Sequence, residues 1–109
     1  MLTFEKIEQP KQQTVALAKI KQLYQAAFPR LERMPFWFLQ RNLKKPAVEL
    51  LSVWQKDSWL GFLYSVVLKD KVFIFYFAID PNLRGQYYGS KVLQALPTVY
   101  SGKKNRLDD

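Results

Sequence analysis

The chain contains neither cysteine nor histidine in its 109 residues. Without cysteine it can form no disulfide and no thiolate zinc site. Without histidine it lacks the commonest metal ligand and the commonest general base. Mechanisms that pair serine or cysteine with histidine are therefore excluded, and we expect no metal site.

Long apolar runs and a signal sequence are also missing. The longest apolar run, residues 72–79, is far shorter than the roughly 20 residues that a membrane-spanning helix needs. Residues 1–6 lack the basic and apolar regions of a signal peptide. These features predict a soluble cytoplasmic protein with no membrane partner.

The composition favours a single folded domain. Hydrophobic residues make up 49% of the chain and aromatic residues 16%, which is far too apolar for a disordered protein. A chain of 109 residues can bury roughly 65% of its unfolded surface in one modest core. We expect one domain over residues 1–109, with residues 103–109 forming a polar tail.

The charge is strongly positive, with 17 Lys and Arg against 9 Asp and Glu and a net charge of +8. This balance favours polyanionic ligands. Apart from residues 103–106 the basic residues are scattered, and the aromatic residues follow core spacing instead of alternating with Lys and Arg. Nucleic acid is therefore an unlikely partner.

The first half of the chain predicts one strand and two helices. Leu2, Phe4 and Ile7 indicate a short strand that closes before Pro10. Apolar residues recur every three to four positions over residues 14–28, which predicts a helix with Thr14 as its N-cap. A second short helix is expected within residues 31–45, with Pro35 as its first residue.

The second half predicts an antiparallel meander followed by a helix. The strands are Val48–Gln55, Trp59–Leu68 and Val72–Ile79, and short polar turns separate them. Gly61 suggests a bulge or a close approach by another backbone, and the apolar third strand suggests that both its faces are covered. The last helix, 89–96, should bury Val92, Leu93 and Leu96 and end at Pro97.

A strand, a turn and a helix start come together over residues 72–96. The strand ends at Asp80-Pro81, and an Arg-Gly-rich turn opens the helix. The first amides of a helix have no acceptor within it and lie at the positive end of its dipole, so they attract anions. Arg84 adds a positive charge, and Gly85 and Gly89 permit close approach. The segment is therefore a candidate phosphate site.

Residues 84–89 also carry a family signature. They resemble the acyl-CoA-binding motif of the GNAT N-acetyltransferase superfamily: Arg or Gln, two free positions, Gly, one free position, then Gly or Ala. Arg84 and Gly89 match this motif, whereas Tyr87 replaces its first Gly. The element order resembles the first part of the GNAT fold, so the resemblance implies an α+β domain: a mainly antiparallel sheet of about four strands between layers of helices, lacking the family's C-terminal strands.

The resemblance implies a site and a reaction. Acetyl-CoA would be the co-substrate, and its acetyl group would pass to a primary amine without a metal or a covalent enzyme intermediate. The expected binding residues are the strand end and the turn that leads into the helix: Phe77, Ala78, Ile79, Arg84, Gly85, Gln86, Tyr87, Tyr88, Gly89 and Ser90.

Catalytic groups are few. Glu49 and Tyr76 are the candidates, with Tyr64 and Asp80 as further possibilities. Each has an ordinary structural alternative: Glu49 as a polar residue on a solvated strand face, and Asp80 as a turn residue before proline. The tyrosine that many relatives use as general acid lies on a helix beyond the matched segment.

A shortened sheet suggests a second function. Without the family's fifth strand, Val72–Ile79 would have an unpaired edge, and an apolar edge strand favours pairing with another chain. We therefore expect a homodimer or other self-association. The alternative to an acetyltransferase is a non-catalytic remnant that acts as an interaction module through this edge.

Overall fold

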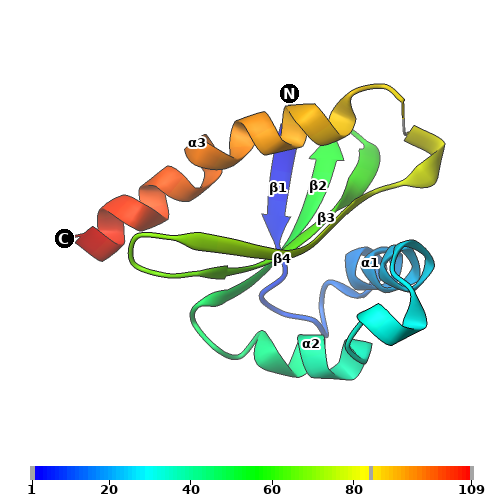
Figure 1. The fold of residues 1–109 in the computed structure, drawn as a ribbon, viewed down its shortest axis with the longest axis horizontal. Helices are drawn as coiled ribbons and strands as arrows, with labels where there is room; N and C mark the ends of the chain where they lie inside the picture. Colours follow the sequence, from blue (N-terminus) through cyan, green and yellow to red (C-terminus); the bar gives the residue numbers. More distant parts are fainter. Residues whose placement is uncertain (1, 84, 109) are drawn as a thin grey trace.

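The structure is a computed structural model that describes residues 2–83 and 85–108, with side chains described as far as residue 100. Its elements are β1 (Leu2–Lys6), α1 (Thr14–Ala27), the 3-10 turn η1 (Arg30–Glu32), α2 (Phe36–Asn42), β2 (Val48–Gln55), β3 (Ser58–Val67), β4 (Val72–Ile79), the 3-10 turn η2 (Pro81–Leu83) and α3 (Tyr88–Asp108). The sheet lies between α3 on one face and α1 with α2 on the other (Figure 1).

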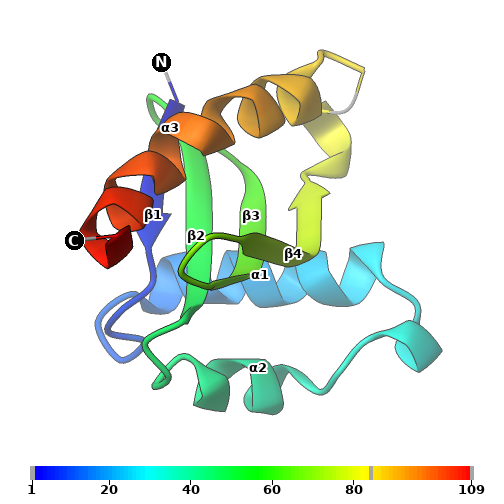
Figure 2. The ribbon, with the colours of Figure 1, turned by 60° about the vertical axis from the view of Figure 1, so that its left-hand side comes forward.

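The four strands form one sheet in the order β1-β2-β3-β4, with every neighbouring pair antiparallel. This confirms the predicted meander. Alternate residues of each strand face opposite helix layers, as seen in β2, where Leu50 packs in the core under α1 and α2 while Leu51 and Val53 pack under α3. Each face of the sheet therefore has its own core. Figure 2 shows the helix layers on the two sides of the sheet.

Gly61 combines the two features that its sequence position suggested. The pairing of β2 with β3 shifts between Val53 and Trp54, so Leu60 is an extra residue beside Gly61. A Cβ atom at Gly61 would lie 2.1 Å from the carbonyl oxygen of Ala78 in β4. Only glycine therefore lets β3 and β4 approach this closely.

Strand β4 is covered along only half its length. Ala78 and Ile79 are buried, whereas Val72, Phe73, Ile74 and Phe75 are 36% to 55% exposed. The prediction that both faces are covered is therefore wrong for the first half of the strand. The reason is that β4 is the last strand of the described sheet, and both cores reach it only from Tyr76 onward.

Helix α3 is longer than predicted. It continues through Pro97 to Asp108, so the predicted end at Leu96 is wrong, and the backbone of residues 103–108 belongs to this helix. Pro97 removes one helical hydrogen bond, but Val92, Leu96 and Tyr100 are all buried against the sheet and hold α3 there on both sides of the proline. Leu93, which was expected to be buried, is 48% exposed.

The start of α1 also differs from the prediction. Gln13 occupies the N-cap position that was assigned to Thr14. The side-chain Oε1 atom of Gln13 accepts hydrogen bonds from the amides of Glu8 and Gln9, and its Nε2 atom donates to Glu5 and to the Lys6 carbonyl. The β1-α1 loop is therefore held by one glutamine. At α2, Pro35 is likewise the cap rather than the first helical residue.

Among the described residues, none of the helices combines the length and the apolarity that a membrane crossing requires.

Tyr100 gives α3 a pH-dependent contact with the sheet. It is buried, its hydroxyl lies 2.9 Å from Ser65 Oγ, and burial raises its pKa above the ordinary value of 10.0. A raised pKa in the folded state means that this stability is complete below about pH 10 and is lost as the pH rises above it. In urea titrations we expect the wild type to lose more stability than Tyr100→Phe as the pH rises above about 10. Equal losses of stability in the wild type and in Tyr100→Phe would contradict this prediction.

Candidate functional site

A pocket of about 500 Å³ lies where the end of β4 meets the start of α3. The C-terminal end of α1 forms its third wall. The lining residues include most of those that the sequence pointed to: Ala27, Phe28, Phe77, Ala78, Ile79, Leu83, Gly85, Tyr87, Tyr88, Gly89 and Ser90. Gln86 is exposed and does not line the pocket, and Arg84 lies outside the described residues.

The start of α3 supplies the polar side of this pocket. The amide of Lys91 donates to the carbonyl of Tyr87 at 3.1 Å, which is the first bond of the helix. The amides of Tyr88, Gly89 and Ser90 precede this bond, so the helix itself offers them no acceptor. These three residues line the pocket, and the helix dipole adds a positive field there. The pocket can therefore hold an anion such as a phosphate.

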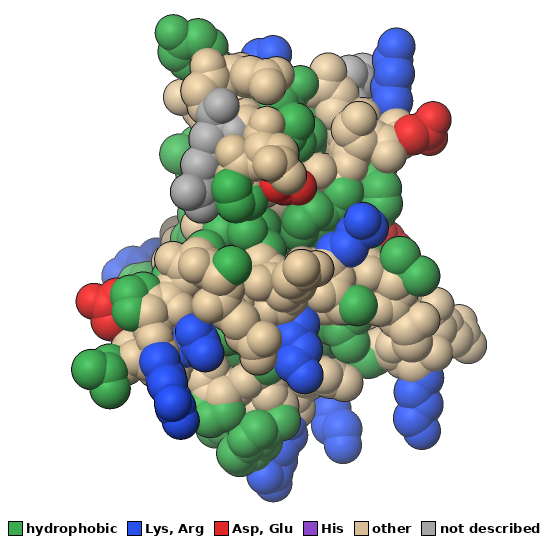
Figure 3. Space-filling model, turned by 90° about the vertical axis from the view of Figure 1, so that its right-hand side faces the viewer, with side chains coloured by type: hydrophobic (Ala, Val, Ile, Leu, Met, Phe, Trp, Pro, Cys, Tyr) green, Lys and Arg blue, Asp and Glu red, His purple; other side chains and the backbone are tan. Residues whose placement is uncertain are grey.

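Apolar groups form the rest of the pocket. Phe28, Phe77 and Leu83 line it from three different elements. Viewed from the side of the η2 turn, hydrophobic side chains lie along the waist between the α3 layer and the layer of α1 and α2 (Figure 3). A ligand with both a phosphate and an apolar arm would match this combination.

Tyr87 stands where the motif has its first glycine, and its backbone keeps a glycine-like conformation. Its φ angle is 64°, in the left-handed region, and its side chain is 77% exposed. A non-glycine residue in this region costs about 1 kcal/mol. The chain therefore retains the turn geometry that glycine normally allows, with the tyrosine ring largely in solvent.

Replacing Tyr87 tests this geometry. We expect Tyr87→Gly to raise the free energy of unfolding by about 1 kcal/mol in urea titrations, because glycine adopts the left-handed conformation without strain. Tyr87→Ala is the matched control, since it removes the ring but keeps the Cβ atom and the strain. A glycine variant no more stable than the alanine variant would contradict the assignment.

Glu49 lies far from this pocket. It is 2% exposed, and its Oε2 atom lies 3.9 Å from Lys6 Nζ. It pairs with Ser65 near the opposite end of β3, whereas the pocket strand residues 77–79 pair with residues 61–63. The alternative of a solvated strand face is wrong, because Glu49 is buried. The structure does not bring this carboxylate to the pocket.

Tyr76 lies next to the pocket without lining it. Its ring centroid is 5.0 Å from that of Phe28, a lining residue, and 4.9 Å from that of Tyr24. The amide of Met34 donates to its hydroxyl at 3.4 Å. Burial raises the pKa of Tyr24 above its ordinary value, and the neighbouring Tyr76 adds to this rise. Tyr76 therefore packs against a lining residue, Phe28, and is not itself part of the pocket wall.

The other two possible catalytic groups have structural roles. The Tyr64 hydroxyl donates to the Leu39 carbonyl at 3.2 Å, and burial raises its pKa. The Asp80 carboxylate accepts from the Asn82 amide at 3.0 Å, which is the turn interaction expected of Asp before proline. In the described part of the chain, no group of three or more acidic residues is placed to hold a metal ion.

Sequence reasoning missed the α1 wall. Ala27 and Phe28 line the pocket. In the sequence they are simply the last residue of α1 and its C-cap, just before Pro29. Their role depends on where α1 crosses the sheet, which no local pattern records. Leu83, in the η2 turn between β4 and α3, was also missed.

Comparison with known proteins gives a family. The model of the acetyltransferase (GNAT) family matches residues 17–101. Among curated protein sequences no match was found. Solved structures with a similar fold include an acetyltransferase of the GNAT family from Bacteroides thetaiotaomicron, with a TM-score of 0.81 and 19% identity over 89% of this chain and 55% of that one.

Two further structures share the fold. The ribosomal-protein-S18-alanine N-acetyltransferase from Escherichia coli has a TM-score of 0.66 and 21% identity, over 94% of this chain and 61% of its own. An aminoglycoside acetyltransferase, meta-AAC0020, from an uncultured soil metagenomic sample has a TM-score of 0.61 and 20% identity, over 94% and 71%. The chain thus spans 55% and 61% of the first two structures. By its sequence and its fold, this chain belongs to the acetyltransferase (GNAT) family.

Proposed function

We propose that this chain binds acetyl-CoA in the pocket between β4 and α3 and transfers its acetyl group to a primary amine. Family and fold support acetyl transfer in general. The observation that carries the proposal for this chain is the meeting, in one pocket, of the β4 residues 77–79 with the first residues of α3, whose amides have no acceptor within the helix.

The two sides of the pocket suit the two parts of the ligand. The pyrophosphate would lie against the amides of Tyr88, Gly89 and Ser90, where the helix dipole favours negative charge. The pantetheine arm would lie along residues 77–79, whose outer edge has no neighbouring strand in the described sheet. Its amide groups can bond an open strand edge much as a peptide does.

Transfer needs positioning more than it needs a strong catalytic group. The neutral amine attacks the thioester carbonyl, so the amide bond forms as the carbon–sulfur bond breaks. The amine then loses a proton, and the thiolate gains one. Placing the thioester beside the acceptor supplies much of the rate enhancement, and we assign no proton-transfer role to a residue of this chain.

Thiol release tests the proposed reaction. With acetyl-CoA and a panel of primary amines, including an aminoglycoside and a peptide with a free N-terminal amine, we expect free thiol to appear at a rate that depends on amine concentration. Tyr87→Gly should increase this rate by improving access to the α3 amides. If binding is normal but thiol release is amine-independent, the transfer step of the proposal is wrong.

The exposed half of β4 supports a second function. Val72, Phe73, Ile74 and Phe75 are four consecutive large hydrophobic residues, all partly exposed on an edge strand. Such an edge favours pairing with another strand. We propose that it mediates self-association, most simply as an antiparallel β4 pair about a twofold axis. This would occur with or without catalysis.

Lysine substitutions test the association. We expect the double variant Phe73→Lys, Phe75→Lys to weaken dimerisation at least about tenfold, because charge on an edge strand opposes pairing. Light scattering over a concentration series measures this. Phe38→Lys on α2, where the ring is 40% exposed, is the matched control and should leave the dimer intact. A wild-type monomer at all concentrations would contradict the proposal.

A further inference from the structure

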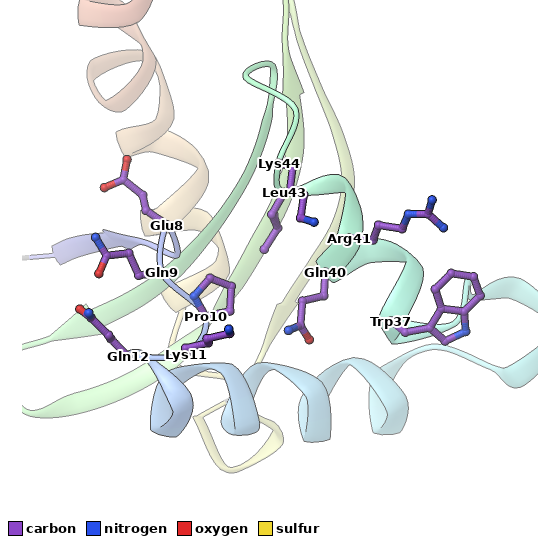
Figure 4. Close-up of a pocket in the computed structure, with 10 residues that line it drawn as sticks. All are labelled: Glu8, Gln9, Pro10, Lys11, Gln12, Trp37, Gln40, Arg41, Leu43 and Lys44. Carbon is purple, nitrogen blue, oxygen red and sulfur yellow. The ribbon is translucent and has the colours of Figure 1, made fainter.

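A second cavity lies away from the pocket between β4 and α3. It is a groove of about 720 Å³ between the β1-α1 loop, residues 8–12, and helix α2. Helix α1 begins beside this groove at Thr14 and ends at Ala27, which lines the acyl-CoA pocket. The two cavities are therefore at opposite ends of α1. Figure 4 shows the groove between its two walls.

Both walls are fixed by contacts outside the groove. The Gln13 side chain holds the loop through bonds of 2.9 Å from the Glu8 and Gln9 amides. Helix α2 is anchored by the buried side chains of Phe36 and Leu39, and the Tyr64 hydroxyl donates to the Leu39 carbonyl at 3.2 Å. A ligand would therefore enter a groove that is already formed, which reduces the entropic cost of binding.

The residues that line the groove carry more positive than negative charge. Lys11 lies on the loop wall, and Arg41 and Lys44 lie on the α2 wall. Within the described residues, none of these three has a carboxylate within ion-pair distance. The single acidic lining residue, Glu8, is paired with Lys6 at 3.5 Å. From the side seen in Figure 3, most Lys and Arg side chains extend from the layer of α1 and α2, to which the groove belongs. The groove therefore attracts negative charge.

The remaining lining residues are apolar or carry amides. Pro10, Leu43 and Trp37 supply apolar surface, and the Trp37 side chain is 63% exposed. In Figure 4, Lys11 and Gln40 point toward each other across the groove, while Trp37 lies on the outer flank of α2. Amide side chains both donate and accept hydrogen bonds, and the groove has three of them: Gln9, Gln12 and Gln40.

We propose that this groove docks an acidic peptide segment of another protein, one that carries at least one large apolar side chain. Carboxylates of the segment meet Lys11 and Lys44 in the groove and Arg41 on the outer flank of α2, and its backbone bonds to the glutamine amides. An apolar side chain of the segment packs on Leu43 inside the groove, and the segment continues over α2 to Trp37, because exposed tryptophan is a common anchor at interfaces. The site does not depend on the acetyl-CoA proposal.

Peptide chemistry fits this groove better than nucleic acid does. A nucleic acid strand places a charge on every nucleotide and needs a continuous row of cations. Here Glu8 lines the same groove, and the three cations are divided between two walls. A peptide can instead place its carboxylates opposite the cations and uncharged groups opposite Glu8.

Fluorescence anisotropy with labelled peptides tests the proposal. The probe is a short peptide in which Glu and Leu alternate, compared with peptides in which Lys replaces Glu or Ser replaces Leu. We expect the Glu-Leu peptide to bind at least about tenfold more tightly than either. The triple variant Lys11→Glu, Arg41→Glu, Lys44→Glu should lose this binding, and Trp37→Ala should weaken it about tenfold.

A charge-matched variant separates a site from general attraction. The triple variant Lys56→Glu, Lys69→Glu, Lys71→Glu changes the net charge equally at the two hairpin turns, and it should bind the Glu-Leu peptide within about twofold of the wild type at moderate salt. Equal losses in both triple variants would overturn the proposal. So would unchanged binding in the groove variant, or tighter binding of a labelled RNA oligonucleotide than of the acidic peptide.

Discussion

Gly61→Ala should destabilise the fold by about 3 kcal/mol or more. The added Cβ atom would lie 2.1 Å from the Ala78 carbonyl oxygen and 3.0 Å from both the Ala78 carbonyl carbon and the Ile79 Cα atom. All three are backbone atoms of β4, so no side-chain rotation can relieve the clash. Relief requires β4 to move away from β3, which also disturbs the pocket at Ala78 and Ile79.

Gly89→Ala is the matched control. Among the described residues its Cβ atom would meet only Ile79 Cγ1, at 4.0 Å, and alanine favours the helix, so we expect unchanged or slightly higher stability. Urea titrations followed by far-ultraviolet circular dichroism measure both variants. If Gly61→Ala cost no more than about 1 kcal/mol, the close approach of β3 and β4 at this point would be wrong.

Ser90→Asp should have opposite effects on folding and on ligand binding. Ser90 lies in the first turn of α3 and lines the pocket. A carboxylate in the first turn of a helix stabilises the helix by about 0.5 kcal/mol through the dipole. The same charge would stand beside the proposed pyrophosphate site. Two negative charges about 6 Å apart at an effective dielectric constant of about 20 repel by nearly 3 kcal/mol, so binding should weaken about a hundredfold.

The control for this variant is Gln94→Asp. Gln94 is an exposed residue in the middle of α3 and does not line the pocket. The Gln94→Asp variant changes the net charge by the same amount as Ser90→Asp, yet it should bind acetyl-CoA nearly as well as the wild type does. Thermal shift measures stability and calorimetry measures affinity. If the Ser90→Asp variant bound acetyl-CoA as tightly as the wild type, the proposed pyrophosphate site at the start of α3 would be wrong.

The meander could be predicted because its signals are local. Polar turns and long apolar runs gave Val48–Gln55 and Val72–Ile79 with the observed bounds. The candidate phosphate-binding turn was also local, since it depends on a strand end and a helix start that are adjacent in sequence. Most of the candidate lining residues therefore fell within a single segment, 77–90.

The misses involve contacts that sequence does not record. Pro97 predicts a helix end by local rules, but burial of Val92, Leu96 and Tyr100 keeps α3 on the sheet. An apolar strand predicts cover on both faces, but the described helices reach only half of β4. The burial of Glu49 likewise depends on tertiary packing, which no local pattern records.

Calorimetric titration of acetyl-CoA into the folded wild-type protein tests the central claim most directly. We predict saturable binding of one ligand per chain with a Kd below about 1 mM, in the range usual for enzyme substrates. The affinity should fall with rising salt because the ligand is anionic. No saturable heat at about 1 mM acetyl-CoA, from protein shown to be folded by circular dichroism, would contradict the assignment of the pocket between β4 and α3 as an acetyl-CoA site.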